Sequence, residues 1–243
     1  MSFKWTMLIA LLIPACALAG TERQSVDLSL SWSVGLEADG TIASLTPLNK
    51  DYQPVLQQRL EPAIRSWRFT AGKVNGTAAP TQTTLNVRVV LEPLESGDYV
   101  VRLRKASTGP TYAHVTLPEY PDSALKFHRE GAVLVDIDYD ADGRVTAANA
   151  MQGGEPKAAA DFQRAAVAAV KHWTLKPETI AGHGMAGKAR IPVCFSFSRR
   201  TGDPSADHCR WKIAGDEEPL DTDHPLALSS VVHLETDIAG RTL

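Results

Sequence analysis

Asp138, Asp140 and Asp142 stand at alternate positions before Gly143 and imitate the start of a calcium-binding loop. An EF-hand loop places oxygen ligands at alternate positions and a glycine at the sixth. The twelfth position here is Asn149 instead of Glu, and no helix is predicted before the loop. The residues therefore fit a solvated Asp-Gly turn better than a calcium site. We expect no metal and no cofactor.

The sequence also lacks the usual patterns of catalytic residues. Its seven histidines are scattered, no serine stands in a nucleophile-elbow sequence, and no glycine run resembles a phosphate loop. The net charge is -3 and no basic stripe is present, which argues against a nucleic-acid partner. We therefore expect neither enzymatic activity nor a small-molecule substrate.

Residues 1–19 have the layout of a secretory signal peptide. Lys4 precedes an apolar run that ends before Pro14, and Ala17-Leu18-Ala19 has the small-residue pattern of a cleavage site. We expect cleavage after Ala19 and export of the chain. The alternatives are an uncleaved membrane anchor, although the run is shorter than a span of about 20 apolar residues, and a lipoprotein signal at Cys16.

Cys194 and Cys209 are the cysteines that remain after such a cleavage. In an exported protein a leftover pair indicates a disulfide. A turn near Thr201-Gly202 would place the two cysteines on facing strands, and closing so short a loop contributes about 3 kcal/mol. Two free thiols are the alternative. A zinc site with His208 is disfavoured because it lacks a fourth ligand.

The sequence contains one pattern twice: strand, Asp-Gly turn, strand, helix, tryptophan, glycine turn, strand. When Trp67 is aligned with Trp173, the apolar positions on both sides match without a gap. Matching pairs include Leu56 and Phe162, Leu60 and Ala166, Ile64 and Val170, Phe69 and Leu175, Gly76 and Gly182, Leu85 and Ile191, and Val87 and Val193. Repeats at fixed spacing indicate related structural units. The pattern predicts two domains, a number that suits 243 residues with 44% hydrophobic content.

The repeat also predicts boundaries and core residues. We expect a signal peptide at 1–19, a first domain at 25–106, a linker at 107–117, a second domain at 118–213 and an acidic, solvated tail at 214–243, in which residues 229–234 offer one more strand. Pro62 lies inside the first helix and should bend or split it. The expected core residues around the tryptophans are Trp67, Phe69, Trp173 and Leu175.

Several ordered motifs of the second copy together resemble the TonB C-terminal domain family. They are the segment Pro118-Glu119-Tyr120-Pro121, the turn Asp142-Gly143, the alanine-rich helix, the run from Trp173 to Pro177, and Gly182 with the strand after it. The resemblance covers residues 115–198 well and residues 26–92 more loosely. It implies an α+β fold in which each of two related small domains is an antiparallel sheet with a helix packed on one face.

The resemblance further implies a periplasmic role that links an inner-membrane motor to outer-membrane receptors. In that family the third strand of the domain pairs with an extended receptor peptide, which is β-augmentation. The corresponding residues here are Arg190, Ile191, Pro192, Val193, Cys194, Phe195, Ser196 and Phe197. Because the sequence shows neither the anchor helix nor the long Pro-rich spacer of a full transducer, we expect a soluble tandem that binds a protein partner in the cell envelope.

A hairpin formed by residues 191–197 and 209–213 would occupy the edge that a receptor peptide needs. This leaves a second interpretation, a structural or assembly protein of the cell envelope with closed sheet edges. A third interpretation, an enzyme or metal sensor, has the least support.

Overall fold

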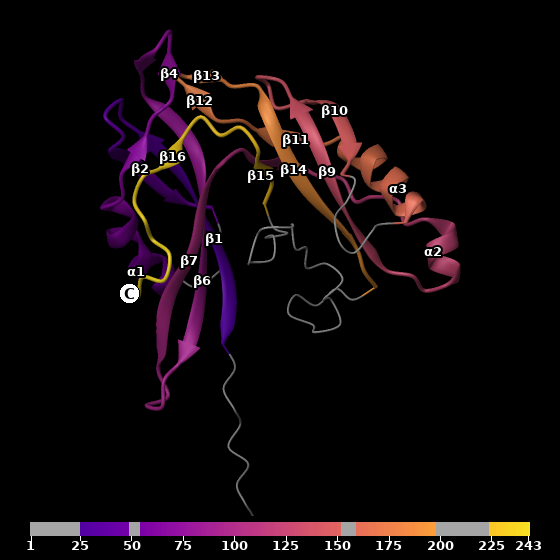
Figure 1. The fold of residues 1–243 in the computed structure, drawn as a ribbon, viewed down its shortest axis with the longest axis horizontal. Helices are drawn as coiled ribbons and strands as arrows, with labels where there is room; N and C mark the ends of the chain where they lie inside the picture. Colours follow the sequence, from indigo (N-terminus) through magenta and orange to yellow (C-terminus); the bar gives the residue numbers. More distant parts are fainter. Residues whose placement is uncertain (1–24, 49–53, 152–158, 198–223) are drawn as a thin grey trace, which may run out of the picture.

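The computed structural model describes residues 25–48, 54–151, 159–197 and 224–243. Within these residues the chain is mostly antiparallel sheet with a few helices, an α+β fold. Two large hydrophobic cores organise it. We call residues 26–109 the first unit and residues 122–195 the second unit. Figure 1 shows α1 of the first unit at one end of the molecule and α2 and α3 of the second unit at the other.

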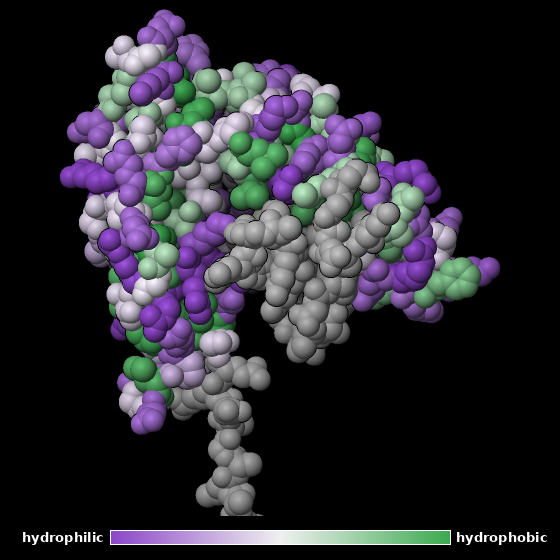
Figure 2. Space-filling view, viewed as in Figure 1, coloured by the Kyte–Doolittle hydropathy of each residue, from purple (hydrophilic) through white to green (hydrophobic). Residues whose placement is uncertain are grey.

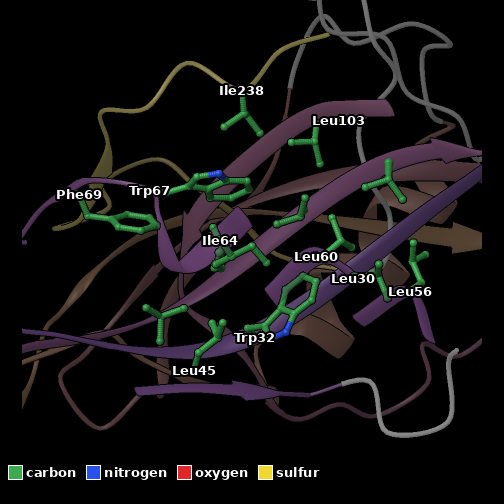
Figure 3. Packing of buried hydrophobic residues seen from close by; sticks show 14 of the residues in the cluster. Leu30, Trp32, Leu45, Leu56, Leu60, Ile64, Trp67, Phe69, Leu103 and Ile238 are labelled. Atoms are coloured by element: carbon green, nitrogen blue, oxygen red, sulfur yellow. The ribbon is translucent and has the colours of Figure 1, made fainter. Parts of the chain in front are cut away.

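The first unit is an antiparallel sheet with one helix against it. Its elements are β1 (Val26–Leu36), β2 (Ile42–Pro47), α1 (Pro54–Arg65), β6 (Thr81–Pro93) and β7 (Tyr99–Gly109), and the sheet order is β2-β1-β6-β7. Leu30 and Trp32 of β1 share a core with Leu60 of α1 (Figure 3). Alternate strand residues face one side, and helix residues four apart share one face. The two periodicities therefore bury one side of each element.

α1 is one helix through Pro62, so the expected split does not occur. Pro62 lies in the last turn of this helix. Its missing N–H therefore removes one backbone hydrogen bond near the end of the helix and leaves the turns before it intact.

The second unit has the first unit's order of strand, strand, helix and strand, preceded by the short helix α2. Its elements are α2 (Asp122–Lys126), β9 (Gly131–Tyr139), β10 (Val145–Ala150), α3 (Ala160–Val170) and β14 (Gly187–Phe195), with β15 (Leu226–Ala227) beyond β14 in the sheet order β10-β9-β14-β15. Phe162, Ala166 and Val170 of α3 are buried against the sheet. In both units the first long strand lies at the centre of the sheet. The origin of both units from one repeated domain stays a prediction.

The remaining strands of the described residues are short. They are β3 (Phe69–Thr70), β4 (Lys73–Val74), β5 (Thr77–Ala78), β8 (Thr111–His114), β11 (Thr174–Lys176), β12 (Thr179–Ile180), β13 (His183–Gly184) and β16 (His233–Leu234).

Backbone pairing joins the two units. β12 pairs with β6 through Thr179 opposite Gln82 and Ile180 opposite Thr81. A Cβ at Gly72 would lie 2.5 Å from Ile180 Cδ1, so glycine leaves the space that Ile180 occupies.

Each unit holds its Asp-Gly turn against the backbone two residues after the tryptophan. Gly40 and Gly143 have φ values of 80° and 82°, which glycine adopts without steric cost. A Cβ would lie 1.7 Å from Phe69 O at Gly40 and 1.8 Å from Leu175 O at Gly143. The N–H of Leu175 donates to Gly143 O at 2.8 Å. No larger residue fits either position without moving the chain.

Trp67 and Trp173 are buried, as are Phe69 and Leu175. The indole N–H of Trp173 donates to Thr116 O at 2.8 Å, and its ring meets Tyr112 of β8 edge to face. Figure 3 shows Ile238, from the C-terminal end of the chain, beside Trp67. The short strand after each tryptophan also pairs with a segment from elsewhere in the chain: β11 pairs with β8, and β3 pairs with β16. Each tryptophan is therefore covered by a segment from outside its own repeat.

Residues 224–243, which we call the C-terminal strap, differ from the solvated tail expected there. They contain β15 and β16, and Val232 and Ile238 lie in the first core with 0% and 5% of their surface exposed. The expected linker likewise contains the end of β7 and all of β8. β16 lies within the stretch 229–234 where the sequence offered one more strand. Ile238 stands among polar and small residues, so it gives no periodic signal in the sequence.

Ile238→Ala should lower the free energy of unfolding by about 2–4 kcal/mol, because it removes buried methyl groups and leaves a cavity. Val74→Ala is the control, since Val74 is 44% exposed and its truncation should change stability by less than about 0.5 kcal/mol. Urea unfolding of both variants tests the packing. Equal stability of the two variants would mean that the strap is not part of the first core.

Asp161 ties α3 to the chain around α2. Its carboxylate accepts a hydrogen bond from Ser123 Oγ at 2.7 Å and pairs with Arg129. The hydrogen bond from Ser123, followed by that from Arg129, lowers the pKa of Asp161 to about 2. Since the folded protein favours the charged form, this group stabilises the fold above its ordinary pKa. That contribution is lost as the pH falls from about 4 towards 2.

Asp161→Asn should therefore lower the free energy of unfolding at pH 7 by about 1 kcal/mol, the range of a partly exposed charged hydrogen bond. The difference from the unmodified protein should shrink as the pH falls below about 4. Asp122→Asn, at an exposed carboxylate of α2, is the control. A difference that stays constant between pH 7 and pH 3 would contradict the assigned role of the charge.

Candidate protein-binding edge

β14 is the strand that the family resemblance noted in the sequence marked as the candidate for partner pairing. It pairs with β9 over its whole length, from Gly187 opposite Tyr139 to Phe195 opposite Gly131. Ile191, Val193 and Phe195 are buried in the second core. Of the eight residues proposed from the sequence, Arg190 to Phe195 lie in β14, and Ser196 and Phe197 follow its end. The strand therefore has one face and one edge committed to the second unit.

The backbone N–H and C=O groups of Lys188 and Arg190, and the C=O of Pro192, point away from β9. Met151 N donates to Leu134 O at 2.8 Å, so the backbone groups of Leu134 point to β10. Pro192 lies opposite Leu134, and in antiparallel pairs a residue directs its N–H and C=O to one side only. The backbone of Pro192 is thus directed to the outer edge, as is that of every second residue before it.

The C-terminal strap occupies the beginning of this outer edge. Leu228 N donates to Lys188 O at 2.9 Å, and Lys188 N donates to Ser229 Oγ at 2.9 Å. β15 adds two residue pairs, Ala227 with Ala189 and Leu226 with Arg190. Across the described residues, pairing with β15 ends at Arg190. Two positions further on, Pro192 lacks an N–H to donate to any added strand.

Ion pairs order the side chains on the face away from the second core. Arg190 donates two hydrogen bonds to the Asp136 carboxylate, at 2.6 and 3.0 Å. The hydrogen bond to Asp136 raises the pKa of Arg190 above its ordinary value. Lys188 contacts Asp138 at 2.7 Å. The two basic side chains next to the edge are therefore held by carboxylates of β9.

Aromatic rings pack at the far end of β14. Tyr120 stacks on Phe197 with ring centroids 5.0 Å apart and meets Phe195 edge to face at 5.6 Å. The Tyr120 hydroxyl donates to Arg129 O at 2.7 Å, and burial raises the pKa of Tyr120. The Tyr-Pro segment noted in the sequence thus closes this end of the second core.

Glu178 is a buried carboxylate that sequence reasoning missed, and it lies where three parts of the chain meet. It is 2% exposed. Thr83 Oγ1 of β6 donates to Oε1 at 2.6 Å, Ser230 Oγ donates to the same oxygen at 2.9 Å, and Val231 N donates to Oε2 at 2.8 Å. Burial raises the pKa of Glu178, against the effect of these hydrogen bonds and of His233. A single glutamate carries no pattern that would have singled it out.

The aspartates of the calcium-like pattern bond to groups of the chain itself. Asp140 accepts hydrogen bonds from the backbone of Asp142 and Arg144, at 3.0 and 2.8 Å. Asp142 pairs with the Arg144 side chain at 2.5 Å. In the part of the chain that the structure describes, no cluster of three or more metal-binding side chains is found.

Cys194 lies in β14 and is disulfide-bonded. Cys209, its predicted partner, and the predicted strand 209–213 lie outside the described residues. The pairing of Cys194 with Cys209 and the hairpin therefore stay predictions. The predicted signal peptide, residues 1–19, also lies outside them. Among the helices of residues 54–65, 122–126 and 160–170, none is long and apolar enough to span a membrane.

Comparison with known proteins finds one family and sequences similar to part of the chain. The family described as Gram-negative bacterial TonB protein C-terminal matches residues 116–197. Protein TonB from Xanthomonas campestris pv. campestris, in strain B100 and in strain ATCC 33913, is 30% identical over 93 residues. The match covers 38% of this chain, and the chain spans 40% of the length of each of these relatives.

Replacing Glu178 should show what its charge does. In Glu178→Gln, one carboxylate oxygen becomes an NH2 group, so the side chain can no longer accept from both Val231 N and the two hydroxyl groups. This loss of an acceptor should lower the free energy of unfolding by about 1–3 kcal/mol at pH 7. Thermal or urea unfolding measures the difference. An exposed matched control is Glu95→Gln, which should leave stability unchanged.

The pH dependence has a definite sign. Since the folded state raises the pKa of Glu178, the stability linked to this group is fully present below its ordinary pKa of about 4.5 and is lost as the pH rises through the raised value. The stability advantage of the unmodified protein over Glu178→Gln should therefore grow as the pH is lowered from 7 to about 4.5. An advantage that shrinks over this interval would contradict a burial-dominated carboxyl group.

Proposed function

We propose that residues 116–197, which form a TonB C-terminal domain, act as a protein-binding module accessory to energy-coupled transport across the outer membrane. The observation that carries the proposal is the pairing of β15 with the outer edge of β14. An extended segment, distant in sequence, already adds to this strand by backbone pairing. A partner peptide of similar shape could use the same groups.

The chemistry of such binding is β-augmentation. The outward N–H and C=O groups of Lys188 and Arg190 supply hydrogen bonds that do not depend on the sequence of the partner. Specificity then comes from alternate side chains, which contact Arg190 and Lys188 on one face and the end of the second core on the other. The expected partner is an extended peptide of an outer-membrane receptor or another envelope protein.

The proposal places the chain in the periplasm after removal of residues 1–19, or on the inner membrane if that segment is kept. It includes a tandem of two TonB-like domains, the first of which is divergent, and a disulfide between Cys194 and Cys209. It assigns no catalytic step, cofactor or small-molecule substrate.

A structural or assembly role in the cell envelope is the second candidate, because the strap covers sheet edges in both units. Besides its contact with β14, it bonds to β7: Leu103 N donates to Arg241 O at 2.8 Å and Leu243 N donates to Val101 O at 2.9 Å. Covered edges are how natural sheets avoid pairing with other chains. This candidate requires that the strap stays in place.

The test compares Arg190→Pro with Arg190→Ala. Both variants lose the side chain that binds Asp136, but only proline loses the outward N–H. Synthetic peptides from the extended N-terminal segments of the outer-membrane receptors of the same cell serve as probes. Both substitutions are made in the variant with a loosened strap described below, because β15 otherwise uses the same N–H of Arg190. In that background Arg190→Pro should bind a receptor peptide about tenfold more weakly than Arg190→Ala, the effect of losing one hydrogen bond worth about 1.4 kcal/mol.

Chemical shifts of the β14 amides would locate the peptide in the same experiment. Equal affinity of the two variants would exclude backbone pairing at Arg190. If none of the receptor peptides binds the unmodified protein or the variant with a loosened strap described below, the transport-linked proposal fails and the structural role is favoured.

A further inference from the structure

We propose that residues 226–229 of the C-terminal strap are a built-in occupant of the β14 edge, which must leave before a partner strand can pair there, while the rest of the strap stays on the first unit. The inference rests on the proposed function in naming the partner strand as the competitor. It concerns regulation of the same edge. Figure 1 shows the strap in yellow, passing from β15 across to β16 and on to the C-terminus near α1.

The strap is held firmly by the first unit. Val232 is fully buried in the first core, and Figure 3 shows Ile238 pointing toward Trp67 and Leu103. β16 pairs with β3, and Arg68 N donates to Thr236 Oγ1 at 2.8 Å. Near the C-terminus, Gly240 N donates to Leu103 O at 2.9 Å. Freeing residues 231–243 would therefore open the first core.

The strap makes far fewer interactions with β14 than with the first unit. Those with β14 are the two residue pairs of β15 and the two hydrogen bonds that Lys188 makes with Leu228 and Ser229. Leu228 is 45% exposed, and Figure 2 shows hydrophobic surface where β15 lies. Ala227 also lies against Gly109 of β7, which belongs to the first unit and not to β14. A short ladder and an exposed Leu228 are the features of segments that open locally at low free energy.

The hydrogen bonds of Glu178 limit how far such an opening can extend along the strap. Its carboxylate binds Ser230 and Val231, directly after the residues that pair with β14. On the other side of the segment, Ser31 Oγ and His224 Nε2 lie 3.0 Å apart. Residues 225–229 therefore form a short span fixed at both ends to groups outside the β14 edge, and the span can leave β14 without release of its ends.

The edge that the span covers is also the usable part of β14 for a partner. The N–H groups of Lys188 and Arg190 point outward, and Pro192 beyond them provides none. A partner strand that pairs with this half of β14 needs the same backbone groups that residues 226–229 occupy. The two cannot be bound together.

Amide hydrogen exchange on the unmodified full chain is the first test. If the span opens alone, the amides of Lys188 and Arg190 should exchange at least tenfold faster than those of Ile191 and Val193, which face β9, and than that of Val232. Exchange of all five amides at one common rate would mean that the strap leaves only with global unfolding, and would overturn the proposal.

The second test loosens the span. Leu228→Pro with Ser229→Ala removes the N–H that donates to Lys188 O and the hydroxyl that accepts from Lys188 N. Leu228→Ala, which keeps the N–H, is the control. The double variant should speed exchange at Lys188 and Arg190 by at least tenfold and leave Val232 and Leu103 unchanged. Unchanged exchange at Lys188, or faster exchange at Val232 as well, would contradict a span that opens alone.

A peptide with the sequence of residues 224–231 is the probe for the vacated edge. It should bind the double variant at least tenfold more tightly than Leu228→Ala, with shifts confined to β14. Equal binding to both would overturn the proposal. This result is independent of the proposed function: a double variant that binds this peptide but no receptor peptide supports the strap and refutes the transport role. Receptor peptides that bind the double variant and Leu228→Ala equally tightly refute the strap and support the transport role.

Discussion

The structure depends on one buried carboxylate where β6, the second unit and the C-terminal strap meet. Glu178 is held by two hydroxyl groups and one backbone N–H, and no basic side chain of the described residues forms an ion pair with it. Burying a charge is costly unless hydrogen bonds replace water, so all three donors must be in place together. Because the donors come from β6 and from the strap while the carboxylate belongs to the second unit, Glu178 fixes how the two units meet and where the strap crosses between them.

The two units share two local structural features. Each places an Asp-Gly turn so close to the chain after its tryptophan that only glycine fits, and each covers the tryptophan with a distant segment. The equivalence is structural and reaches beyond side-chain pattern. The segments that cover the tryptophans, β8 and the strap, each complete a core that the unit alone leaves open.

The sequence predicted the long elements well because they carry periodic signals. The alternation in β1 and β14, the four-residue spacing in α1 and α3, and the Asp-Gly turns all appear where they were expected. The sequence did not predict β8, β12 or β15, because strands of two to four residues show no period and their partners are distant. It offered one more strand at residues 229–234, where β16 lies, but not the pairing of that strand with β3. At the candidate site, β14 was identified but its occupant was not: Leu226, Ala227 and Leu228 are too short an apolar run to predict a strand, and Glu178 is a single charge in a turn-rich stretch.

The pairing of β12 with β6 has a mechanical consequence. A strand pulled along its own axis loads all of its hydrogen bonds at once, whereas one pulled sideways loads them in turn. Force applied along β14 would pass into β9 through their full-length ladder and reach the first unit through the two pairs of β12 and the carboxylate beside them. The ladder between the units has two residue pairs where β14 and β9 have nine, so tension between the units would load few hydrogen bonds at their junction and many within the sheet.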